Sequence, residues 1–113
     1  PNNTFVAEFV GAPPMALIDS AALNGFAPDQ TIGIRAENIQ IAPKGEGRMR
    51  CVVTENEFLG SETLIGLSHA HTAGLCVLKP GLSMIPEGQE IDITFVDDHL
   101  HVFDAAGKRL AAR

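Results

Sequence analysis

Apolar and polar residues alternate along most of this chain in short runs that are typical of β-strands. In one such run Met49, Cys51 and Val53 are placed to face one way, and Arg50, Val52 and Thr54 are placed to face the other. Similar runs recur along the chain, separated by Gly, Pro, Asn and Asp, which favour turns. They predict strands at Ala16–Ser20, Thr31–Arg35, Ile39–Ala42, Arg48–Asn56, Glu62–Ser68, Gly74–Lys79, Glu90–Val96 and His101–Asp104. Many short strands at this spacing indicate an all-β protein, and we expect a small OB-like β-barrel.

The first segment has a different pattern. Between Thr4 and Gly11 the apolar residues fall at positions 5, 6, 9 and 10, which is the spacing of a short helix face. Two helical turns are marginally stable alone, so we expect this helix to pack on material that precedes Pro1 and the chain to be a piece of a longer protein. The expected division is a linker or helix from an upstream domain, residues 1–14, followed by an OB-like domain, residues 15–113.

The stretch from Glu55 to Leu67 contains the clearest corner of the predicted barrel. It has the pattern of a strand end, a turn at Gly60 and the start of the next strand. Ser61 and Glu62 place a hydroxyl and a carboxylate at this corner. A polar pair on a rigid corner is better suited to docking than to core building, so we expect a binding surface here.

Composition and charge argue against several classes of function. The chain has 113 residues, which is one domain's length, and a net charge of −6. It contains six Phe but no Tyr or Trp, which argues against a stacking platform for single-stranded nucleic acid. The negative charge repels a phosphate backbone, so we expect no nucleic-acid partner. The sequence has no signal peptide and no apolar run long enough to cross a membrane, which indicates a cytoplasmic protein.

Histidine and cysteine leave alternatives open. His69-Ala70-His71 and His99-Leu100-His101 are H-x-H pairs that could together hold Zn²⁺, or they are ordinary solvated residues at strand ends. Cys51 and Cys76 lie in apolar runs, which predicts buried reduced thiols, with a disulfide as the alternative. We find no G-x-S-x-G elbow, Walker A pattern or dinucleotide fingerprint, so we expect this fragment to have no catalytic site and no nucleotide cradle.

Several phrases of the chain resemble the ATP-binding subunits of ABC importers. They occur in the family's order and cover nearly the whole chain: NTFVAEFVGAPPM at Asn3–Met15, GIRAENI at Gly33–Ile39, LGSET at Leu59–Thr63 and VFDAAGKRL at Val102–Leu110. The resemblance implies the C-terminal regulatory domain of the TOBE/MOP type from importers of sugars, polyols or glycerol phosphate, similar to the maltose and sn-glycerol-3-phosphate importers. ATP and Mg²⁺ would bind in the upstream domain, and this fragment would need no cofactor of its own.

The same resemblance implies particular partners. In this family the regulatory domains of two subunits stay in contact across a two-fold axis, which implies a homodimer through the parent subunit. Transmembrane permease subunits would bind the upstream domain, placing the subunit on the inner face of the plasma membrane. A cytoplasmic regulatory protein or a small effector is a further implied partner. We expect Arg35, Glu37, Gly60, Ser61 and Glu62 to form the partner or dimer interface. The alternative is a free-standing β-barrel that binds a small oxyanion or a metal.

Overall fold

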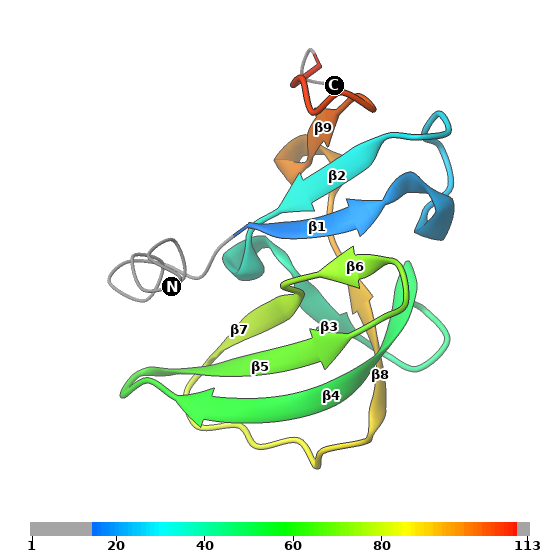
Figure 1. The fold of residues 1–113 in the computed structure, drawn as a ribbon. Helices are drawn as coiled ribbons and strands as arrows, with labels where there is room; N and C mark the ends of the chain where they lie inside the picture. The colour runs from blue at the N-terminus through cyan, green and yellow to red at the C-terminus, as the bar shows by residue number, and fades with distance from the viewer. Residues whose placement is uncertain (1–14, 111–113) are drawn as a thin grey trace.

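The computed structural model describes residues 15–110, so the helix predicted between Thr4 and Gly11 lies outside the described residues. The described chain is all-β, with strands joined by short turns and 3₁₀ segments (Figure 1). The strands are β1 Ala16–Asp19, β2 Thr31–Ile34, β3 Gln40–Ala42, β4 Met49–Phe58, β5 Glu62–Ser68, β6 Thr72–Ala73, β7 Cys76–Pro80, β8 Glu90–Thr94 and β9 His101–Phe103. The 3₁₀ segments are η1 Ser20–Ala22, η2 Ala36–Asn38 and η3 Asp97–His99. Within residues 15–110 no helix is long and apolar enough to span a membrane.

Two antiparallel sheets make up the fold. The first has the order β6-β1-β2-β9 and the second the order β3-β8-β4-β5-β7, and Figure 1 shows the first above the second. The chain crosses between them repeatedly, because β6 returns to the first sheet after β5 and β9 returns after β8. This interleaved arrangement of short antiparallel strands confirms the predicted all-β, OB-like fold.

The core lies between the sheets and is built mainly from β-branched residues. Ile18, Ile32 and Ile34 come from the first sheet, and Ile65 and Ile93 come from the second; all are fully buried. Isoleucine is well suited to these positions, because its β-branched side chain favours the strand backbone and fills the apolar interior.

The alternation predicted along β4 is confirmed. Met49, Cys51 and Val53 are buried, whereas Arg50 and Thr54 are exposed and Val52 is half-buried. The pairing with β5 then shifts at a bulge after Val53, so the alternation of exposed and buried positions does not continue regularly to the end of the strand.

One strand differs from the sequence prediction. The strand β6 was not predicted, because Thr72–Ala73 is too short to show a period and pairs with β1 at two residues only. Within the predicted strand β5, Gly66 lies opposite the β4 bulge. A Cβ at Gly66 would come within 2.9 Å of both the Glu55 Cγ and the Thr54 Oγ1 atoms, so the bulge leaves no room for a side chain there.

Candidate functional site

The β4–β5 hairpin turns where the sequence predicts a corner. The Leu59 N–H donates to the Glu62 carbonyl at 2.7 Å and closes the turn, and Gly60 has a φ of 102°. An ordinary side chain is strained at this φ, which explains the glycine. Ser61 is exposed and Glu62 is partly exposed, so both polar groups reach solvent.

The loop that follows β7 runs along this hairpin and is bonded to it. The Gly81 N–H donates to the Ser61 carbonyl at 2.8 Å. Thr63 is fully buried, and its hydroxyl donates to the Gly81 carbonyl at 2.7 Å and accepts from the Ser83 N–H at 3.0 Å. A hydroxyl that uses both its donor and an acceptor fixes the loop against the strand.

A second attachment lies further along the hairpin. The Asn56 amide donates to the Ile85 carbonyl at 2.8 Å and accepts from the Ile85 N–H at 3.0 Å. The Asn56 side chain thus makes with the Ile85 backbone the two hydrogen bonds that a neighbouring strand would make. The loop from Gly81 to Ile85 is therefore held at both ends.

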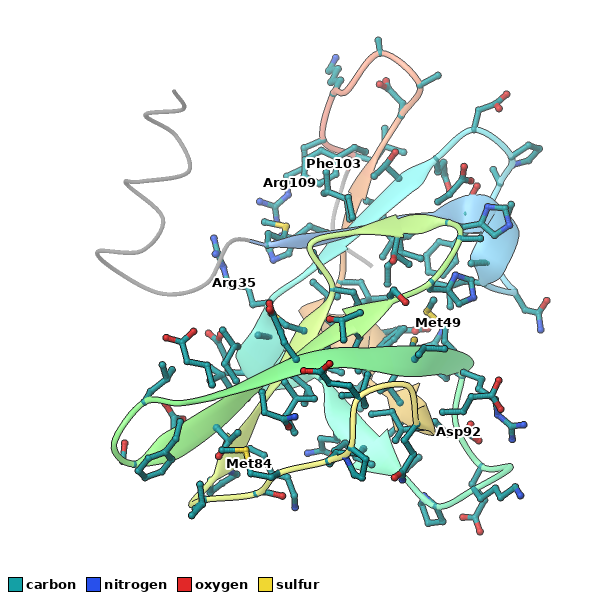
Figure 2. The ribbon with its side chains drawn as sticks, turned by 60° about the horizontal axis from the view of Figure 1, so that its bottom comes forward. Arg35, Met49, Met84, Asp92, Phe103 and Arg109 are labelled. Carbon is teal, nitrogen blue, oxygen red and sulfur yellow. The ribbon has the colours of Figure 1, made fainter. Side chains whose placement is uncertain are left out.

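Large apolar side chains are exposed on this assembly. Phe58 is 45% exposed, Leu59 48%, Leu82 67% and Met84 57%. We call these four residues the tip patch; Figure 2 shows Met84 beside the hairpin. Two other large apolar residues of the described chain are exposed, Leu17 at 43% and Val96 at 56%. Exposed apolar residues gathered on a hydrogen-bonded support are typical of a docking surface.

Acidic residues lie on the same hairpin as the tip patch. Glu55 and Glu57 are exposed near the end of β4, and Glu62 lies at the start of β5. Lys79 on β7 is the nearby cation on the neighbouring strand. Sequence reasoning identified the polar corner but missed the tip patch, because a loop containing Leu82 and Met84 has no periodic pattern to read.

The predicted interface residues lie in two places. Gly60, Ser61 and Glu62 form the hairpin corner, whereas Arg35 and Glu37 are exposed at η2, which packs near β7. Within residues 15–110 no hydrogen bond or ion pair joins the η2 residues to the corner. Reciprocal pairing of these groups therefore does not occur within one chain.

The histidine pairs are too far apart to share a metal ion. His69 and His71 have ring centroids 5.8 Å apart and lie beside β6, at one edge of the first sheet. His101 lies on β9, at the opposite edge, with β1 and β2 between them. Across residues 15–110 no three His, Cys, Asp or Glu side chains are grouped closely enough to hold a metal ion.

The cysteines are free and buried, as predicted. Burial, with a smaller effect of Asp92, raises the pKa of the Cys51 thiol to about 11. Burial, with a smaller effect of Glu55, raises the pKa of the Cys76 thiol to about 11. Both groups are neutral at physiological pH and serve as small apolar residues of the core.

A hollow of about 490 Å³ lies beside β3, β4 and β8, with Asp92 in its wall. The Asp92 carboxylate accepts from Arg50 Nε at 2.8 Å and from the N–H groups of Gly45 at 2.6 Å and Gly47 at 3.4 Å. The Arg50 hydrogen bond, helped by these backbone donors, holds the pKa of the Asp92 carboxyl below its ordinary value. The carboxylate thus fastens the loop between β3 and β4.

Comparisons with known proteins identify the family to which this fold belongs. Residues 32–103 match the family model of the TOBE domain. The chain is 36% identical to the sn-glycerol-3-phosphate import ATP-binding protein UgpC of Rhizobium meliloti (strain 1021), over 97% of this chain and 36% of that protein. It is 31% identical to the trehalose/maltose import ATP-binding protein MalK of Thermococcus litoralis, over 92% of this chain and 36% of that protein.

A further relative is the sn-glycerol-3-phosphate import ATP-binding protein UgpC of Rhodopseudomonas palustris (strain ATCC BAA-98 / CGA009), which is 32% identical over 99% of this chain and 38% of that protein. The chain thus spans little more than a third of the length of these relatives. The family model covers most of the described residues and both sheets. The chain belongs to the TOBE domain family.

Proposed function

We propose that this chain is the C-terminal regulatory and dimerisation domain of the ATP-binding subunit of an ABC importer. The observation that carries the proposal is that 92% to 99% of the chain aligns with three import ATP-binding proteins. By analogy with those relatives, the transported solute is a sugar, a polyol or glycerol phosphate. ATP, Mg²⁺ and the permease subunits would contact an upstream domain, and the subunit would lie on the cytoplasmic face of the membrane.

The tip patch is the proposed contact between two such subunits. A hairpin corner around Gly60 that meets its own copy would form an isologous contact, with Ser61 and Glu62 at its edge. The apolar side chains would supply the attraction, and the surrounding carboxylates would keep the contact weak. A weak contact would suit two subunits whose upstream domains separate and approach while their regulatory domains stay in contact. Arg35 and Glu37 lie apart from this contact and are not part of it in our proposal.

Regulation would follow from a difference in affinity. A regulatory protein or effector that binds one arrangement of the two subunits better than the other shifts their equilibrium toward it. A preference of about 1.4 kcal/mol changes the balance about tenfold, which is enough to slow transport substantially. The domain would then act without any catalytic group of its own.

The reading frame upstream of Pro1 tests the assignment directly. We expect the genomic sequence to continue upstream, in the same frame, into a Walker A motif, an ABC signature motif and a switch histidine. Finding all three would support an ATP-binding subunit. A start codon immediately before the Pro1 codon, or an upstream domain of another kind, would overturn the proposal.

A further inference from the structure

The hollow beside β8 exists because β3 ends before the strand with which it pairs. The last pair of the β3–β8 ladder joins Ala42 to Asp92, and β8 begins two residues earlier, at Glu90. After Ala42 the chain leaves the sheet in the loop that leads to β4. The space beside Glu90 and Ile91 is the hollow of about 490 Å³, a volume within the range of small-molecule sites.

Arg50 is held in the wall of this hollow with part of its guanidinium group available. It lies on β4 opposite Asp92, and its Nε donates to Asp92 Oδ1 at 2.8 Å. Asp92 is 6% exposed and is fixed in turn by the N–H groups of Gly45 and Gly47. Among residues 15–110 no acceptor is hydrogen-bonded to the Arg50 Nη groups, and the side chain is 47% exposed. A guanidinium oriented through Nε presents its two Nη groups as a fork that matches the two oxygens of a carboxylate.

The other charged side chains of the wall are those of Lys44 and Glu90. Both residues are exposed, and neither has an ion pair within the described part of the chain. Together with Arg50 and Asp92 they give the wall two positive and two negative charges, whereas the whole protein has a net charge of −6. A simple anion is repelled by the protein as a whole. A molecule of zero net charge that carries both signs avoids this repulsion and finds a partner for each of its charges.

The remaining part of the wall is largely apolar. Ile41 and Ala42 at the end of β3 are partly exposed, and Ile91 on β8 borders the same hollow. An aliphatic group placed between these side chains would be removed from water. The wall therefore suits a small molecule with a carboxylate, an ammonium group and a short aliphatic chain.

We propose that this hollow is a binding site for a small aliphatic α-amino acid. The ligand carboxylate accepts from the Arg50 Nη groups and from Lys44, and the ligand ammonium donates to Glu90. The aliphatic side chain contacts Ile41 and Ile91. The site goes beyond the proposed function and does not depend on the transporter assignment, because it is argued from side chains of this chain alone.

The test compares L-valine with two compounds that each lack one of its charged groups, isovalerate and isobutylamine. Each compound is titrated into the chain at neutral pH and low ionic strength, and methyl signals are followed by NMR. The signals of Ile41, Ala42 and Ile91 should move saturably with valine, while those of Ile18, buried in the first sheet, stay in place. Either singly charged compound should bind about tenfold more weakly, since it loses a charge-assisted contact. Saturable shifts that are absent, or equal affinity for either analogue, would overturn the site.

Glu90→Gln should change the two carboxylates in opposite directions. Valine should bind about tenfold more weakly, because its ammonium loses an ionised acceptor, whereas isovalerate should bind more tightly, because a negative charge has left the wall. The matched control is Glu46→Gln, which removes the same charge from an exposed residue outside the hollow and should change either affinity less than about twofold. An equal effect of the two substitutions would show that net charge, not contact with Glu90, decides the binding.

Two further variants test the fork and the space. Arg50→Lys keeps the charge but removes the paired donors, so valine should bind about tenfold more weakly. Arg109→Lys is its matched control, since Arg109 is bridged to β9 in the other sheet, and Figure 2 shows it well away from Asp92.

Ala42→Leu fills the hollow without removing any charge and should abolish the saturable shifts at Ile91. Circular dichroism checks that each variant is folded. Valine affinity that is unchanged in Arg50→Lys or in a folded Ala42→Leu variant would overturn the site.

Discussion

Asp92 shows how one carboxylate can set the position of a loop. Replacing it by Asn should lower the melting temperature at pH 7, because Arg50 and the Gly45 and Gly47 N–H groups lose an ionised acceptor. The pKa of Asp92 is lowered in the folded state, so its stabilisation is fully present above the unfolded value of about 3.9. It is lost as the pH falls through the folded value. The melting temperatures of the parent and Asp92→Asn should therefore converge below about pH 4.

The control for this prediction is Glu46→Gln, an exposed residue of the same loop. It also removes one negative charge, but its side chain has no hydrogen bond or ion pair to any described residue. Its melting temperature should follow that of the parent at every pH. If the deficit of Asp92→Asn were the same at pH 7 and at about pH 3, ionisation of Asp92 would not be its cause.

At the scale of elements, the loop after β7 depends on one hydroxyl. Thr63→Val keeps the shape of the side chain but leaves the Gly81 carbonyl and the Ser83 N–H without this partner. Thr63 is fully buried, so we expect a loss of about 1–3 kcal/mol in the free energy of unfolding, measured with urea. Amide exchange of Ser83 should also become faster.

Thr63→Ser separates the hydroxyl from the methyl group. It retains both hydrogen bonds and loses one buried methyl, which should cost about 1 kcal/mol. Ser83 should then stay protected from exchange. A valine variant as stable as the serine variant, with Ser83 still protected, would show that the loop is held by other contacts.

The elements that sequence could predict are those set by local pattern. Strands such as β4 and β5 were predicted because burial on one face of a strand repeats at every second residue. The corner was predicted because glycine readily adopts the positive φ that such a turn needs, and Gly60 has a φ of 102°. The attachment of Thr63 to Gly81 joins residues 18 apart, and that of Asp92 to Gly45 joins residues 47 apart. No periodic pattern records such pairings, so the supported tip patch could be found only in the structure.

At the scale of the whole molecule, the tip patch should govern self-association of the parent subunit. Leu82 is the most exposed large apolar residue of the described chain, at 67%, and it lies on the loop bonded to the hairpin. Leu82→Asp would place a charge in an apolar contact close to Glu62, so we expect sedimentation to show about tenfold weaker association. Val96→Asp is the matched control, since Val96 is 56% exposed and precedes η3, away from the hairpin.

The dependence of self-association on ionic strength is an independent test of the tip-patch contact. Two copies that meet at this acidic surface repel each other electrostatically, so added salt should strengthen association of the parent subunit by screening the carboxylates of Glu55, Glu57 and Glu62. A contact made instead between this surface and a basic partner would weaken with salt, because screening then removes an attraction. Association that falls as salt is added, or that responds equally to Leu82→Asp and Val96→Asp, would place the dimer contact elsewhere and leave the tip patch for a partner of opposite charge.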